Sequence, residues 1–213
     1  MQRLGIALLV LLGLGFVGYR VVLPRAWSQP ASTPLSLEGE PRQTPLGQPE
    51  RIQVDRDGRE YVVEKLFDYE ISGEVLSASS YDVTWTTDFS DVDVALIWGP
   101  RRERFKELFT FGQMGRWLFW RFDESVSAED RRDVALHVSN NHLIPSEKSK
   151  HVASAFRMLR EGDKVRLTGS LVRVLGPGGH PLASSSVSRD DSGDGACEVV
   201  WVDELQVGSR IFR

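Results

Sequence analysis

The sequence has little of the chemistry that marks disulfide-rich or metal-binding proteins. Among 213 residues there is one cysteine, Cys197. This count excludes an intramolecular disulfide framework and a zinc site built from several cysteines, although a lone thiol does not fix the cellular compartment. Of the four histidines, His137 and His142 are five residues apart, which does not place them on one face of a helix. We therefore expect no metal site and no cofactor.

The composition is also unlike that of a disordered or strongly basic chain. Hydrophobic residues make up 41% of the sequence and charged residues 26%, as in a globular protein. The first fifty residues hold four basic and three acidic side chains. The remaining 22 basic and 27 acidic residues give a net charge of −5. Because an acidic domain lacks the overall positive charge that attracts phosphates, the sequence predicts no nucleic-acid partner.

The N-terminus carries one long apolar run. Residues 4–23 contain a single charged side chain, and as a helix they would span the ~30 Å of a bilayer core. This pattern predicts a transmembrane signal-anchor over residues 1–25 that contacts the membrane through residues 4–23. A cleaved secretory signal is the alternative, but no clear small-x-small cleavage pattern follows the run. The short N-terminal tail favours a single-pass protein of the inner (cytoplasmic) membrane, with its C-terminal domain periplasmic or otherwise extracytoplasmic.

A proline-rich stretch follows the apolar run. Five prolines fall between Ser28 and Pro49, where no apolar periodicity remains. Because prolines remove backbone donors and favour extended segments, we expect a linker over residues 26–50 and a globular domain over residues 51–213.

Alternating apolar and polar residues predict a mainly β domain. The expected strands lie at residues 68–79, 92–99, 115–122, 163–176 and 197–208, with a helical stretch that begins after a Ser127 cap. In element order this resembles the OB fold, a five-stranded barrel with a helical insertion between strands 3 and 4. The expected fold class is therefore α+β, mainly β, with one N-terminal transmembrane helix. A different α+β sheet with the same element order stays open.

The acidic loop "DDSGDG" resembles a calcium loop only in part. Asp190, Ser192 and Asp194 occupy the first, third and fifth places of that motif, but Trp201 stands where a bidentate glutamate is needed. A tight turn between strands is the simpler interpretation. Cys197 follows at once, beside Glu198, whose charge opposes thiolate formation. We interpret this cysteine as a small buried side chain rather than a nucleophile.

Two further groups of residues allow a structural or a functional interpretation. The stretch "SNNHLIPS" follows a predicted helix, so its polar residues either cap that helix or contact a ligand. The aromatic rings either pack in the core, which we favour, or stack on nucleic-acid bases. These rings are Trp85, Trp98, Trp117, Phe119, Trp120, Phe122 and Trp201.

The stretches "SNNHLIPS" and "SSSVSRDDSGDGACE" also resemble those of a group of uncharacterised bacterial envelope proteins. In that group an N-terminal membrane segment precedes a small β-rich domain, and the resemblance covers this chain from about Tyr69 onward. It implies membrane attachment and no known reaction, so no catalytic residue is carried over.

The leading hypothesis is a membrane-tethered exported module of the cell envelope that binds an envelope protein or a small polar ligand. The candidate binding residues are Asn140, Asn141, His142, Arg189, Asp190, Asp191, Asp194 and Glu198. The rival hypothesis is a metal-dependent or carboxylate/histidine hydrolase that uses His142 and the loop from Asp190 to Glu198.

Overall fold

The computed structural model describes residues 26–56, 58–82, 89–149, 151–188 and 197–213. In chain order the elements are β1 (Gln29–Pro30), β2 (Arg42–Arg56), β3 (Arg59–Ser80), β4 (Val92–Ile97), α3 (Arg102–Leu108), β5 (Phe109–Met114), β6 (Trp117–Phe122), α4 (Ala128–Asp133), η2 (Val134–His137), β7 (Val138–Pro145), α5 (Val152–Phe156), β8 (Lys164–Leu175), η3 (Pro177–Gly179), β9 (Pro181–Ser184), β10 (Glu198–Val207) and β11 (Arg210–Phe212).

Nine strands form one mixed sheet, and five of them close into a ring. The sheet order is β1-β11-β10-β7-β4-β3-β8-β9, with β2 paired to β3. Strand β10 pairs with β7 in parallel and with β8 in antiparallel register, which closes the ring β3-β4-β7-β10-β8. A Cβ atom at Gly169 would lie 1.9 Å from the carbonyl oxygen of Trp201. Glycine therefore permits the close approach of β8 and β10 that completes the ring.

The inner face of the ring holds the largest apolar cluster. Val94 and Leu96 of β4, Leu143 of β7 and Val200 of β10 contribute to it, and Phe156 of α5 packs against them. Two smaller apolar clusters lie on the outer face. One gathers around Ile144 and Trp201, and the other joins β4 and β7 to α3, β5 and the residues around α4.

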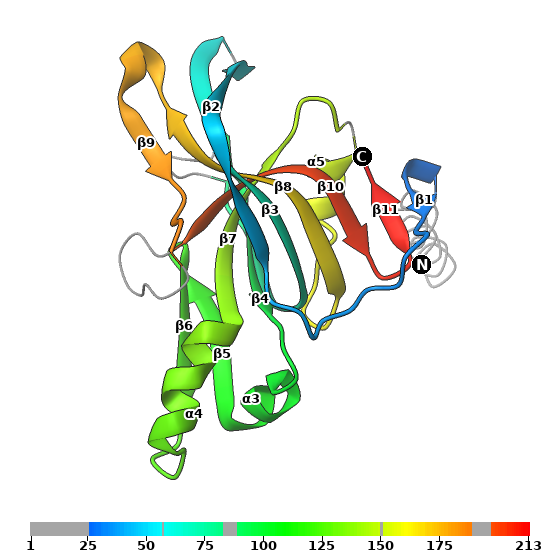
Figure 1. The fold of residues 1–213 in the computed structure, drawn as a ribbon, viewed down its shortest axis with the longest axis vertical. Coiled ribbons are helices and arrows are strands. Elements are labelled where there is room, and N and C mark those ends of the chain that lie inside the picture. Colours follow the sequence, from blue (N-terminus) through cyan, green and yellow to red (C-terminus); the bar gives the residue numbers. More distant parts are fainter. Residues whose placement is uncertain (1–25, 57, 83–88, 150, 189–196) are drawn as a thin grey trace, which may run out of the picture.

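The short two-stranded sheet β5-β6 extends away from the ring together with α3 and α4, at the bottom of Figure 1. Strand β9 and the distal end of β2 extend at the opposite end of the molecule (Figure 1). The N-terminal cap of α4 is the predicted one, since the Ser127 side chain accepts a hydrogen bond from the Asp130 amide.

The structure corrects the predicted fold class. The main sheet has nine strands rather than five, and the aromatic stretch expected as the third barrel strand forms β6, which pairs only with β5. The third place in the ring belongs to β7, which contains the "SNNHLIP" stretch expected at a helix end. Backbone pairing with β4 and β10 on both sides overrides the low strand preference of asparagine there.

The predicted transmembrane helix, residues 4–23, lies outside the described residues. In the part of the chain that the structure describes, no helix combines the length and the apolar character needed to cross a membrane. This finding corrects the predicted single-pass fold and the predicted inner-membrane localisation. Within the expected linker, residues from Arg42 onward belong to β2 and pair with β3. The proposed domain boundaries stay a prediction.

Candidate functional site

Strand β7 divides its polar residues between two faces of the sheet. Side chains alternate along a strand, so Asn140 and His142 share a face, and Asn141 shares the other face with Leu143. Leu143 belongs to the inner apolar cluster, whereas Ile144, on the face of His142, belongs to an outer cluster. The "NNH" stretch therefore places one asparagine inside the ring and places the other asparagine and the histidine outside it.

On the outer face His142 pairs with Asp93 of β4. The two residues are directly opposite in the strand register, and the Nδ1 atom of His142 lies 2.7 Å from Oδ1 of Asp93. The Asp93 side chain is fully buried, and that of His142 is 17% exposed. This pairing fixes the orientation of the imidazole, with the other ring nitrogen directed away from the carboxylate.

The surroundings of His142 favour its charged form. Burial by itself lowers the pKa of the imidazole, but hydrogen bonds to Asp93 and to the Cys197 side chain outweigh it and raise the pKa to about 9. The charge of Asp93 adds to this effect. The ring is therefore an imidazolium at neutral pH, which compensates the charge of a buried carboxylate.

The turn of the β5-β6 hairpin covers this pair. Arg116 in the turn donates from a guanidinium nitrogen to Oδ1 of Asp93 at 2.8 Å and from another to the Ser90 carbonyl. Its backbone amide donates to the Tyr81 hydroxyl at 3.1 Å, and its guanidinium lies 4.6 Å from the Tyr81 ring centre. Arg116 is also the one non-glycine residue with positive φ, 71°, in the described chain. Its contacts with Asp93 and Tyr81 hold this strained backbone.

Asn140 connects the hairpin turn to Cys197. Its Nδ2 atom donates to the carbonyl of Arg116 at 2.7 Å and to Sγ of Cys197 at 3.4 Å. Its Oδ1 atom accepts from Nε2 of Gln113 at 2.6 Å. Cys197 is half-buried and directly precedes β10. We name Tyr81, Asp93, Arg116, Asn140, His142 and Cys197 the polar cluster.

Polar residues on the inner face of the ring have different contacts from those of the polar cluster. Asn141 is fully buried and donates to the carbonyl of Val94 at 3.1 Å and to the Ser139 hydroxyl at 2.8 Å. Glu198 is opposite Asn141 in the register and alternates with Val200 of the inner cluster, so it shares the face of Asn141 and not that of His142. Asn141 thus holds neighbouring parts of the ring together.

The structure brings together only part of the predicted site. Arg189, Asp190, Asp191 and Asp194 lie outside the described residues. Asp93 and Arg116 were missed, and Cys197 was assigned a packing role. The alternation in "DVDVALIW", which sets Asp93 on the same face as Ala95, was the available signal for a carboxylate on the outer face. Ligand binding by Asn140, Asn141, His142 and Glu198 stays a prediction.

The polar cluster brings a thiol, an imidazole and a buried carboxylate together. Among the described residues no group of three or more His, Cys, Asp or Glu side chains is arranged to hold a metal ion. A thiol, an imidazole and a buried carboxylate in succession are the arrangement that activates a nucleophile. For the hydrolase hypothesis, the structure places Asp93 and Cys197 beside His142, in place of the loop from Asp190 to Glu198.

The outward face of the β5-β6 hairpin exposes aromatic rings. Trp117 is 48% exposed and Phe119 36% exposed. The Phe119 ring lies over Gly112 of the neighbouring strand, where a Cβ atom would come within 2.7 Å of it. The Arg121 guanidinium lies 5.6 Å from the Phe119 ring centre. We name Trp117, Phe119 and Arg121 the hairpin face. The buried Trp98 and Trp201 confirm the core interpretation for those two rings, whereas Trp85 lies outside the described residues.

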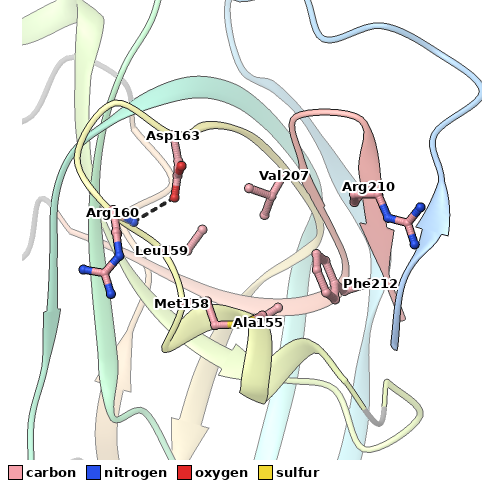
Figure 2. A pocket seen from close by; sticks show the side chains of 8 residues that line it. All are labelled: Ala155, Met158, Leu159, Arg160, Asp163, Val207, Arg210 and Phe212. Carbon is pink, nitrogen blue, oxygen red and sulfur yellow. Dashed lines mark hydrogen bonds between the residues drawn. The ribbon is translucent and has the colours of Figure 1, made fainter. Parts of the chain in front are cut away.

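A separate cavity of about 270 Å³ lies beside α5 and the end of β10. Figure 2 shows Leu159, Val207 and Phe212 around it, with the side chains of Arg160 and Arg210 directed outward on opposite sides. It contains no residue of the polar cluster or of the hairpin face.

The comparison with known proteins found a relative whose name states what that protein binds. A protein of Nocardia farcinica (strain IFM 10152) named "Nucleotide-binding protein" is 29% identical to this chain over 142 residues, which cover 63% of this chain and 83% of that protein. No family model matches the sequence, and no solved structure matches it. The relative's name describes binding and no membrane or envelope role. The name therefore does not support the expected envelope anchor.

Proposed function

We propose that this protein binds nucleotides by stacking their bases on the hairpin face. The observation that carries the proposal is the exposure of Trp117 and Phe119 on one side of a two-stranded hairpin, with Arg121 against the second ring. The name of the Nocardia relative supports nucleotides as the ligand class. The shared chemistry is a flat base with an adjacent phosphate, either free or within a single strand.

The spacing of the two rings suits bases. Trp117 and Phe119 are two residues apart on β6 and so point to the same side, roughly 7 Å apart along the strand. Aromatic side chains offer a stacking surface to any base, and stacking contributes about 1–3 kcal/mol per base. Exposed apolar side chains that gather on one surface also mark interaction sites more often than single scattered ones do.

The hairpin face carries a cation for the phosphate. Arg121 forms no ion pair with any described residue, so its charge is not neutralised by a neighbouring carboxylate there. Arg131 lies 4.5 Å from the ring centre of Phe122, which alternates to the other side of β6, so Arg121 is the cation on the hairpin face itself. The net charge of the whole chain, −4, opposes long-range attraction of nucleic acids, so local stacking carries the affinity.

The test is a titration of the full chain with AMP, ATP and a short single-stranded oligonucleotide. Tryptophan fluorescence and calorimetry report binding. Trp117→Leu keeps an apolar side chain and removes most of the stacking surface, so we expect affinity to fall by about 5- to 100-fold, as the stacking energy implies. A stronger response to the oligonucleotide than to AMP identifies the strand as the natural source of the bases.

The matched control is Leu136→Ala, which truncates another exposed apolar side chain, 49% exposed, in η2 and not in the hairpin. It should leave affinity unchanged, and both variants should keep the melting temperature of the parent. Absence of binding to all three ligands at millimolar concentration contradicts the proposal, as does equal affinity of the parent and Trp117→Leu.

A further inference from the structure

We propose that Cys197, His142 and Asp93 form a nucleophile site for acyl transfer, in which Cys197 takes an acyl group from an activated ester or thioester and passes it to water. This activity is independent of nucleotide binding at the hairpin face. It rests on geometry within the polar cluster.

Three neighbouring strands supply the three groups. Asp93 is on β4, His142 on β7, and Cys197 directly precedes β10, and these strands are adjacent in the order β10-β7-β4. Asp93 is opposite His142 in one register, and Val199 is opposite His142 in the other. Cys197 is two residues before Val199, so it shares the outer face and lies diagonally from His142, within reach of a long side chain.

The histidine is oriented as a general base requires. Its Nδ1 atom faces the buried carboxylate of Asp93 at 2.7 Å, so the other ring nitrogen is available for proton exchange with the Cys197 side chain, to which the ring is hydrogen-bonded. Nucleophile, base and orienting carboxylate thus follow one another, which is the relation that activates a thiol. Asp93 acts through His142 and is a positioning residue.

Two observations favour acyl transfer over disulfide chemistry at Cys197: the position of Asn140 and the presence of one cysteine in the chain. The Nδ2 atom of Asn140 lies 3.4 Å from Sγ of Cys197, so an acyl group on the sulfur would have an amide donor next to its carbonyl oxygen. Because the chain contains one cysteine, no second thiol of the same chain can resolve an oxidised sulfur into a disulfide.

Charged and titratable side chains surround His142 from the neighbouring elements. Asp93 faces it from β4, Cys197 from the start of β10, and Arg116 from the hairpin turn through their shared carboxylate. Tyr81 contacts Arg116 from the segment after β3. Glu198 lies on the opposite face of the sheet. Burial lowers the pKa of His142, but hydrogen bonds to Asp93 and Cys197 raise it to about 9.

The reaction balances with water as the only co-reactant. The thiolate attacks the acyl carbon, an S–C bond forms, and the bond to the leaving alcohol or thiol breaks as that group takes the proton from His142. Neutral His142 then takes a proton from water, whose oxygen attacks the thioester carbon. The S–C bond breaks, the carboxylic acid leaves, and the thiolate–imidazolium pair is restored. No oxidant or reductant is consumed.

The test treats the full chain with p-nitrophenyl acetate and follows p-nitrophenolate release together with peptide mass analysis. We expect a burst of about one equivalent and an acetyl group on Cys197. His142→Gln should slow acetylation of Cys197 at least 100-fold, Asp93→Asn should slow it about tenfold and shift its pH profile, and Cys197→Ser should abolish the burst. His151→Gln, a histidine outside the polar cluster, should leave the rate unchanged.

Thermal melts establish that each variant is folded, and nucleotide binding by Cys197→Ser shows that the hairpin face is intact. If Asp93→Asn is unfolded, the His142→Gln and Cys197→Ser pair still decides the result. Acetylation of lysines without Cys197, or equal rates in the parent and His142→Gln, would overturn the proposal. Oxidation of Cys197 by hydrogen peroxide without any acyl transfer would overturn it too.

Discussion

The inner and outer faces of β4, β7 and β10 differ in what they do with polar side chains. Inside the ring, Asn141 lies beside the apolar cluster and donates to the Val94 carbonyl and to the Ser139 hydroxyl. Outside, the side chains of Asp93 and Asn140 interact with a hairpin from elsewhere in the chain, and His142 pairs with Asp93. The outer polar cluster lies between two apolar clusters that hold the hairpin and the adjacent strands in place.

This difference teaches that adjacent residues of one motif can have unrelated roles. Because side chains alternate along β7, we expect its inner residues to contribute to folding stability and its outer residues to affect the reactivity of Cys197. Substitutions on the inner face should change the free energy of unfolding without changing the reactivity of Cys197. Substitutions on the outer face should change that reactivity, and the four predictions below test this division.

The largest effect is expected for Leu143→Ala on the inner face. Leu143 is fully buried in the ring, so its truncation leaves a cavity and should lower the free energy of unfolding by about 3 kcal/mol. Urea unfolding measures this loss, and Leu136→Ala should change stability by less than about 0.5 kcal/mol. A loss below about 1 kcal/mol for Leu143→Ala would mean that this face is not the core.

The sequence predicted single elements better than their partners. The alternation in residues 163–176 predicted β8, which spans Lys164–Leu175, and the Ser127 cap was predicted correctly. The aromatic stretch before residue 122 was recognised as a strand, but a local pattern does not name the strand it pairs with, and β6 pairs with β5. The "NNH" stretch was not recognised as a strand, because its pairing energy comes from β4 and β10 and not from its own composition.

The candidate site was harder to predict because its members are distant in the sequence. Cys197 was set aside for lack of a neighbouring base, yet the fold brings His142 to it across adjacent strands. The alternation in "DVDVALIW" sets Asp93 on the face of Ala95, but it does not show which residue lies beside that carboxylate. Only the strand register, which the sequence does not specify, places it opposite His142.

The second prediction concerns the pH dependence contributed by His142. Its pKa is raised in the folded protein from the ordinary 6.5 to about 9, so its contribution to stability is fully present below pH 6.5 and is lost as pH rises through 9. The stability difference between the parent and His142→Gln should shrink by up to about 3 kcal/mol from pH 6 to pH 10. Urea unfolding at several pH values measures it. A difference that stays constant over this range contradicts the assigned ion pair.

The third prediction compares the two asparagines. Asn140→Ala and Asn141→Ala each remove side-chain hydrogen bonds of a buried amide, so each should cost about 1–2 kcal/mol of stability. Only Asn140→Ala should change the acetylation rate of Cys197, because Asn141 lies on the other face. Thermal melts and mass analysis of the two variants in parallel give the comparison. Equal effects on Cys197 would remove the distinction between the faces.

The smallest effect separates backbone strain from side-chain contacts at Arg116. Arg116→Ala and Arg116→Gly both lose the ion pair with Asp93, but the φ of 71° suits glycine and not alanine. The glycine variant should therefore be about 1 kcal/mol more stable than the alanine variant in urea unfolding. Equal stabilities would show that the hairpin turn relaxes when the guanidinium is gone.

The central claim, that the outer face of β7 controls the reactivity of Cys197 and the inner face does not, is tested most directly by the rate at which iodoacetamide alkylates Cys197 at pH 7. The rate is measured in the full-length parent, His142→Gln and Leu143→Ala proteins, under conditions where all three are folded. The account predicts that His142→Gln reacts at least tenfold more slowly than the parent and that Leu143→Ala reacts at the parental rate. Equal rates in the parent and His142→Gln, or slowing in Leu143→Ala as large as in His142→Gln, would contradict it.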